Sequence, residues 1–272
     1  MTPDSKDRYS INSILRACAI LKSYQGSTSR FKVSELARQL RLDRSTTYRL
    51  LLSLEKGGLL EKDPETGEYS LGLAAFEIGN TYARQMDFIQ IARPVMAALA
   101  QRLEETVHLA VLSDTEIVYV ERKESPRVLG VISKIGQRAP VYCTALGKVL
   151  LAAQPEKERS RVLDQITLRS FTKKTHSSKA RFAEELKKVQ EQGYGVDNKE
   201  HEEDVECIAA PIRDHHGNTI AALSVSGPIK KIGTPLEKKF VTEVKKATAL
   251  ISSRLGYPGS CKPFDTKGGW VR

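Results

Sequence analysis

The chain has 272 residues, of which 40% are hydrophobic and 28% charged, proportions typical of a globular protein with room for about two domains. It contains no apolar run of the length that spans a membrane, and its first ten residues lack the apolar stretch of a signal peptide. We therefore expect a cytoplasmic protein that makes no membrane contact. Lysine and arginine number 43 against 33 acidic residues, and this surplus of +10 favours an anionic partner such as nucleic acid.

Cysteine and glycine patterns give no sign of a redox, metal or nucleotide site. Cys18, Cys143, Cys207 and Cys261 are far apart and form no C-x-x-C pair, which is typical of a reducing compartment. No zinc-ligand spacing occurs, and Gly147-Lys148 lacks the other residues of a phosphate-binding loop. We expect no metal ion, no cofactor and no catalytic residue.

The start of the chain predicts two short helices. Residues 10–24 carry apolar side chains at helical spacing, and Ser10 is placed to cap the first turn. Residues 34–40 repeat the pattern, with Ser34 in the capping position. Each helix is therefore expected to start at a serine.

A third helix is predicted over residues 44–58, after a turn at 41–43 that directs Leu42 inward. Gly57-Gly58 supplies its end. Its buried face is expected to consist of Thr47, Leu50, Leu51 and Leu54. Two short helices joined by a tight turn form the helix-turn-helix pattern.

The outer face of this third helix has the residue types that contact DNA. Its first turns carry Arg44, Ser45, Thr46, Tyr48 and Arg49. The N-terminal end of a recognition helix meets base edges in the major groove, and an arginine fork pairs with guanine. These residues are therefore expected to divide base and phosphate contacts among them.

A β-hairpin is predicted directly after the recognition helix. Apolar residues of the 59–71 segment flank a turn-forming cluster at 63–67, and a hairpin in this place is a wing. Phosphate contacts are assigned to Arg30, Lys32 and Lys62, and Ser34 completes the predicted DNA-binding set.

The remainder of the chain alternates between helices and strands. Residues 73–104 predict a nearly continuous helix that is interrupted at Pro94. Strands are then expected at 106–112, 116–122, 128–133, 207–214 and 219–226, and helices at 145–153, 178–193 and 235–256. The tail at 258–272 is rich in glycine and proline and is expected to be disordered.

Polar residues of the second half could converge on a small ligand. Thr144 opens a predicted helix, whose first N–H groups suit a carboxylate oxygen. Ser224 and Ser226 alternate along a strand, so both hydroxyls point to one face. Asp197 and Cys207 bracket residues 198–206, a loop able to close over a ligand.

The motifs, taken in order, resemble the IclR family of bacterial transcriptional regulators. The likeness covers about residues 10–256 and is carried by Ser34-Glu35-Leu36-Ala37, residues 44–51, 54–58, 69–72, Arg93-Pro94, 105–109, Ala145-Leu146-Gly147-Lys148, 193–197 and 224–228. Each fragment alone is weak evidence for the family, whereas the order and spacing of the fragments are specific to it.

The resemblance implies an α/β (α+β) chain of two domains. A winged helix-turn-helix domain is expected at 1–72, a linker helix at 73–92 and a GAF-like mixed α/β effector domain at 93–257. It also implies a homodimer or homotetramer, whose paired heads would favour a palindromic operator.

The resemblance also implies the residues of an effector site. An apolar wall is expected from Val128, Val131 and Ala139, and the remaining contacts from Thr144, Ala145, Leu146, Asp197, Cys207, Ser224 and Ser226. Because a charged Asp197 would repel an anion, it is better placed to accept a hydroxyl. The expected effector is a small organic acid with a carboxylate at one end and a hydroxyl or keto group at the other.

Together these features predict a sequence-specific transcriptional regulator whose operator binding responds to that acid. Two other classes remain open: a small-molecule enzyme with an accessory helical domain, and an adaptor that uses the winged helix to bind protein. The sequence leaves repression and activation equally open.

Overall fold

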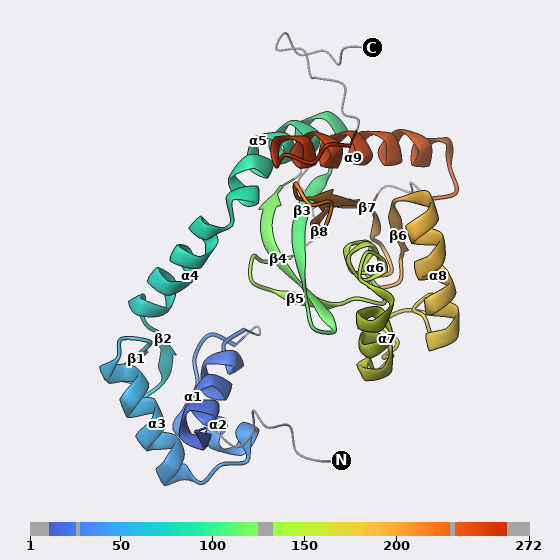
Figure 1. The fold of residues 1–272 in the computed structure, drawn as a ribbon. Helices are drawn as coiled ribbons and strands as arrows, with labels where there is room; N and C mark the ends of the chain where they lie inside the picture. The colour runs from blue at the N-terminus through green and yellow to red at the C-terminus, as the bar shows by residue number, and fades with distance from the viewer. Residues whose placement is uncertain (1–10, 26–27, 125–132, 229–231, 260–272) are drawn as a thin grey trace. The chain divides into compact units, whose positions relative to one another are not determined.

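The computed structural model describes residues 11–25, 28–124, 133–228 and 232–259 (Figure 1). Ser10, most of the strand expected at 128–133 and nearly all of the predicted tail lie outside these ranges. By its internal contacts the chain divides into two compact units, residues 1–85 and 86–272.

The first unit is a winged helix-turn-helix, as predicted. Its elements are α1 (Asn12–Ser23), α2 (Val33–Leu40), α3 (Arg44–Lys56), β1 (Leu60–Lys62), β2 (Tyr69–Leu71) and α4 (Leu73–Gln85). β1 and β2 pair antiparallel and form the wing. The core of the unit contains Ile20, Tyr24, Phe31, Leu36, Leu51, Leu54, Leu60 and Tyr69.

Local sequence explains the sharp turn between α2 and α3. Arg41 ends α2 in the left-handed conformation, with φ of 52°. Asp43 then caps α3 by accepting the backbone N–H of Thr46 at 2.7 Å. The expected cap at Ser34 is wrong, because α2 already begins at Val33. Ser34 therefore lies in the first turn, and the N-cap is Lys32, whose N–H is accepted by the Glu35 carboxylate at 2.8 Å.

The helix expected over residues 73–104 is broken at Met86 rather than at Pro94. α4 ends at Gln85, and α5 runs from Asp87 to Leu103 with Pro94 inside it. Proline removes one helical hydrogen bond, but its ring here faces solvent. The buried face of α5 continues on both sides of the proline, through Ile89, Ala92, Met96 and Leu99, so the packing holds the helix together.

The second unit is built on a six-stranded antiparallel sheet. Its strands are β3 (Thr106–Ser113), β4 (Glu116–Lys123), β5 (Arg138–Pro140), β6 (Gly195–Asn198), β7 (Glu206–Arg213) and β8 (Thr219–Gly227), in the order β5-β4-β3-β8-β7-β6. α6 (Ala145–Ala152), α7 (Glu156–Gln165), α8 (Lys179–Gln192) and α9 (Pro235–Arg254) complete it. The predicted mixed α/β class is confirmed, and so are both hairpins around residues 114 and 216.

Helices cover both faces of this sheet (Figure 1), and each face carries one apolar cluster. α5 and α9 pack against one face, where Leu109 and Leu223 belong to their cluster. α6, α7 and α8 supply the other cluster, with Ala110 and Ala222 of the same two strands. Neighbouring residues of a strand thus point to opposite cores. Within the described residues, no helix is long and apolar enough to cross a membrane.

Candidate DNA-binding surface and effector pocket

α3 turns a polar face to solvent and an apolar face to the core of the first unit. Arg44, Tyr48 and Arg49 are exposed, and Tyr48 retains 45% of its accessible surface. On the opposite side Thr47 and Leu51 are fully buried. A large aromatic side chain left in water among basic residues is informative, because it can stack on or hydrogen-bond to a partner.

The predicted DNA-binding residues differ in their exposure and in whether another side chain already binds them. Ser45 is exposed, but its Oγ donates to Asp43 Oδ1 at 2.8 Å, and Thr46 is half-buried. Hydrogen bonds from Thr46 and Ser45 hold the pKa of Asp43 well below its usual range, so the cap stays ionised. Arg30 is 2.9 Å from Asp63 Oδ2 in the wing turn. The remaining predicted contacts, Lys32, Ser34 and Lys62, are exposed.

A hollow of about 500 Å³, measured with its solvent-filled mouth, lies in the second unit. Its lining comes from β3, β4, β6, β7 and β8, from the start of α6, and from the segments before β5 and between β6 and β7. The residues are His108, Tyr119, Ser133, Gln137, Thr144, Ala145, Leu146, Asp197, His201, Glu202, Val205, Cys207, Ser224 and Ser226. We call this hollow the effector pocket.

The fold brings seven of the predicted effector residues into this lining: Thr144, Ala145, Leu146, Asp197, Cys207, Ser224 and Ser226. Ala139 is an exception. It lies opposite Ile117 in the sheet and is packed in the apolar cluster with α6, so it is a core residue rather than a pocket wall. Val128 and Val131 lie outside the described residues.

The start of α6 forms one side of the effector pocket. Thr144 Oγ1 accepts the N–H of Gly147 at 3.1 Å and donates to the carbonyl of Pro140 at 2.9 Å. Gly147 is required here, because a Cβ atom would lie 2.4 Å from the Val141 Cα. The cap fixes the first turn, whose leading N–H groups have no partner within the helix and suit an anionic oxygen.

Asp197 lies on β6, directly opposite Cys207 of β7. Its Oδ1 accepts the backbone N–H of Glu200 at 2.7 Å. Burial, reinforced by the nearby Glu200 carboxylate, raises the pKa of Asp197 to about 7. The carboxyl group is therefore partly protonated near neutral pH, and the full negative charge assumed from the sequence is not what the pocket presents.

The sheet register explains why the other polar residues converge. His108 of β3 lies opposite Ser224 of β8, and Cys207 of β7 lies opposite Ser226. The two serine hydroxyls are 3.4 Å apart, as their alternation along the strand predicts. All four side chains belong to the lining of the pocket.

Seven lining residues are absent from the predicted contacts, although the last three belong to the 198–206 loop that was expected to close over a ligand: His108, Tyr119, Ser133, Gln137, His201, Glu202 and Val205. The clearest missed signal is His108, a polar residue in the middle of the apolar run TVHLAVL. Burial lowers its pKa to about 3, and burial also raises the pKa of Tyr119. Both side chains are therefore uncharged hydrogen-bonding groups at neutral pH.

Comparisons with known proteins give a consistent result. The family model described as IclR helix-turn-helix domain matches residues 13–64, and that of the bacterial transcriptional regulator IclR C-terminal matches residues 80–253. The chain is 35% identical to the HTH-type transcriptional regulator KdgR of Escherichia coli, over 91% of this chain and 94% of that protein. It is 33% identical to XynR of the same organism, over 91% and 98%.

Among solved structures, the chain is similar to an IclR homolog from Microbacterium hydrocarbonoxydans complexed with 4-hydroxybenzoate. The TM-score is 0.78 at 25% identity, and the match covers 90% of this chain and 99% of that one. The similarity thus extends over both units of the chain.

Proposed function

The chain belongs to the IclR family of bacterial transcriptional regulators, as a helix-turn-helix regulator rather than an enzyme, and we propose that a small organic acid bound in the effector pocket modulates its binding to operator DNA. One observation carries this proposal: hydrogen-bonding groups from five strands and a helix start converge on a hollow in the unit that does not contain α3. Convergent polar groups in a pocket are typical of a small-molecule site.

On the DNA side, α3 enters the major groove with its N-terminal turns. Arg44 and Arg49 are exposed and read bases, while Tyr48 contacts the backbone or a base edge. Lys32 and Lys62 hold phosphates and fix the register. Arg30 joins them once it leaves Asp63, an exchange that costs little because the ion pair is exposed.

On the effector side, the leading N–H groups of α6 receive the carboxylate of the acid. Asp197, Ser224 and Ser226 hydrogen-bond hydroxyl or keto groups at its other end. Eleven of the fourteen lining residues have polar side chains, which favours such a ligand over a purely apolar one. 4-Hydroxybenzoate, the ligand of the Microbacterium homolog, has this combination of groups.

The assembly is a homodimer or homotetramer in the bacterial cytoplasm, where the chromosomal DNA lies. Its support is an unusual set of exposed apolar side chains in the first unit, on α1 or next to it and on α4: Ile11, Ile14, Leu15, Leu73, Phe76, Ile78 and Tyr82. Exposed apolar side chains favour burial against another surface, and a symmetric dimer buries the same residues of both subunits. Two identical heads then bind a palindromic operator.

The test begins with selection of duplexes from a randomised library by the full-length chain. Enriched duplexes should contain inverted repeats, and their affinity should fall steeply with salt. Isothermal titration with 4-hydroxybenzoate, pyruvate, lactate and gluconate then tests the pocket, followed by operator binding with each acid present. Failure to enrich any duplex would contradict the DNA-binding role, and enrichment without a response to any acid would contradict the effector role.

A further inference from the structure

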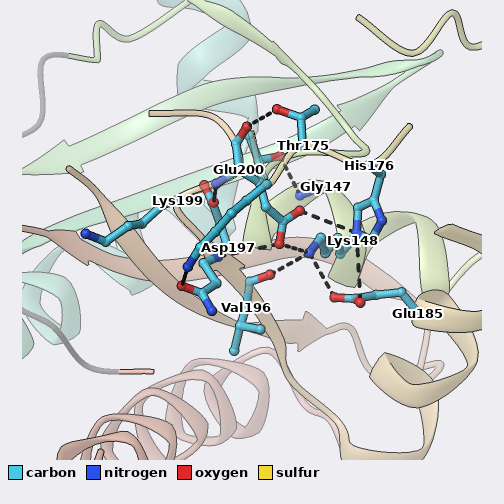
Figure 2. A network of polar contacts seen from close by, with 12 residues as sticks. Gly147, Lys148, Thr175, His176, Glu185, Val196, Asp197, Lys199 and Glu200 are labelled. Carbon is cyan, nitrogen blue, oxygen red and sulfur yellow. Dashed lines mark hydrogen bonds and ion pairs between the residues drawn. The ribbon is translucent and has the colours of Figure 1, made fainter. Parts of the chain in front are cut away.

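Lys148 lies two residues after the pocket residue Leu146 and is buried with its charge fully paired (Figure 2). Its side chain has no exposed surface, although it lies on α6 among apolar neighbours. The Nζ atom is 2.8 Å from Glu185 Oε1, 2.7 Å from Glu200 Oε1 and 2.8 Å from the carbonyl oxygen of Val196. An ammonium group has three donors, so these three acceptors satisfy it completely.

Two of the three acceptors belong to residues 196–205, the segment that forms one wall of the pocket. Val196 lies in β6, and Glu200 follows that strand. The backbone N–H of Glu200 donates to Asp197 Oδ1, and its carbonyl oxygen accepts the Thr175 hydroxyl at 2.6 Å. Lys148 is therefore joined to Asp197 by two routes, through the carbonyl of the preceding Val196 and through Glu200, and neither Lys148 nor Glu200 lines the pocket itself.

The third acceptor ties the same ammonium to a different element. Glu185 lies on α8 and is not part of the pocket wall. Buried ion pairs are a weak source of stability, because well-packed apolar residues are often equally stable in their place. A lysine with three acceptors at fixed positions does, however, define one arrangement of the groups that it joins.

The arrangement of acidic groups around Lys148 is better explained by the lysine itself than by a bound metal ion. Ligand atoms of His176, Glu185 and Glu200 lie within 4.8 Å of one another, a spacing that could hold a metal. Lys148 already supplies a cation to both carboxylates. A metal ion would stand beside this ammonium, and like charges in a buried site repel strongly.

We propose that Lys148 is a positioning residue of the effector pocket: through Glu200 it holds the 196–205 segment in the conformation that directs the Asp197 carboxyl into the pocket. The inference rests on the effector pocket proposed above. It adds that Lys148, which does not line the pocket, holds the 196–205 segment in place. The two carboxylates bound to Lys148 then have different roles, since only Glu200 belongs to the 196–205 segment, which carries lining residues of the pocket.

That difference supplies a matched pair of variants. Glu200→Gln and Glu185→Gln each remove one carboxylate from the same ammonium and keep the size of the side chain. Hydrogen exchange on the full-length chain, without any ligand, should become about tenfold faster at residues 197–205 in Glu200→Gln. Glu185→Gln should leave this segment within about twofold of the wild-type rate, even where it lowers the melting temperature equally. Equal effects of the two variants, or no effect of Glu200→Gln, would overturn the proposal.

The titration of Asp197 gives a second readout that a loss of stability does not move. The charge of Lys148 lowers the pKa of Asp197 and opposes the effect of burial, whereas the carboxylate of Glu185 is hydrogen-bonded to Lys148. In ¹³C NMR of labelled aspartate, Lys148→Met should move the Asp197 midpoint above its wild-type value, and Glu185→Gln should leave it in place. If folded Lys148→Met keeps the wild-type midpoint of Asp197, the proposal is contradicted. If Lys148→Met does not fold, the hydrogen-exchange comparison of Glu200→Gln with Glu185→Gln tests the proposal instead. Because neither measurement uses a ligand, acids that fail to bind would overturn only the function proposed for the pocket.

Discussion

His108 of β3 lies directly opposite Ser224 of β8, and its Nε2 atom is 2.5 Å from the Ser133 hydroxyl. Burial keeps this imidazole neutral, because it lowers the pKa of His108 to about 3. The ring is thus a hydrogen-bonding group beside a serine hydroxyl rather than a positive charge. An effector carboxylate would therefore form no ion pair with His108, which agrees with the proposal that the N–H groups at the start of α6 bind it.

The first prediction concerns base contacts by α3. Arg49→Ala should weaken binding to the selected operator by ~1–3 kcal/mol and relax specificity at one position, because a bidentate base contact is lost. Fluorescence anisotropy with operator variants measures both effects. Lys56→Ala is the control, since Lys56 is also exposed but lies at the far end of α3. Equal losses in the two variants would mean that only general charge matters.

The second prediction concerns the effector response. Asp197→Ala should leave operator affinity unchanged and blunt the effect of an acid that binds the wild-type pocket, because the hydroxyl-binding group is lost. Anisotropy titrations with and without that acid measure the two properties separately. A variant that loses operator binding instead would show that Asp197 supports the fold rather than the ligand.

The third prediction is a pH dependence of stability that Asp197 imposes. Its folded pKa of about 7 lies above the ordinary value of 3.8, so the folded state retains a proton that the unfolded state releases. Its contribution to stability is present below about pH 4 and is lost as the pH rises towards 7. Relative to Asp197→Asn, the wild-type melting temperature should therefore decline over this range. Parallel melting curves from pH 4 to pH 7 would contradict the assigned shift.

Much of the fold could be predicted from sequence, because long amphipathic segments and turn-forming residues leave recognisable patterns in the sequence. The wing and the hairpins around Asp114 and Gly217 follow from such turns. The short β5 and β6 and the mostly polar α7 were missed, since three or four residues show no clear period and α7 buries only Val162. Pro94 was misjudged because burial along α5 outweighs one lost hydrogen bond.

Only part of the effector pocket could be predicted, because sequence patterns reveal local motifs better than contacts between distant elements. Leu146, Ser224 and Asp197 belong to motifs that carry the family resemblance, and Thr144 directly precedes one of them. The Lys148 cluster joins residues from α6, α8 and the segment after β6, and no local spacing links elements so far apart in sequence. Ala139 shares a sheet face with the pocket residue Tyr119, since its partner Ile117 is two residues from Tyr119, and sequence does not tell how far along that face the hollow extends.

The fourth prediction tests the tight start of α6. Gly147→Ala should lower the melting temperature and weaken the binding of any acid, because its Cβ would lie 2.4 Å from Val141 Cα and 2.5 Å from Val141 O. Gly79→Ala is the matched control in α4, where no atom lies within 4 Å of the added Cβ. It should stabilise the chain by roughly 0.5–1 kcal/mol through helix propensity. Thermal melts of the two variants must therefore shift in opposite directions.

The fifth prediction concerns assembly through the exposed apolar side chains of the first unit. Phe76 is 68% exposed and Ile14 is 57% exposed, values that are costly in water unless another surface covers them. Phe76→Ser and Ile14→Ser should shift the mass measured by light scattering towards the monomer and weaken binding to a palindromic operator more than to a half-site. Ile135→Ser is the control, because Ile135 is 61% exposed but belongs to the second unit. If all three variants keep the wild-type mass, these side chains do not form the subunit interface and the two heads must be joined elsewhere.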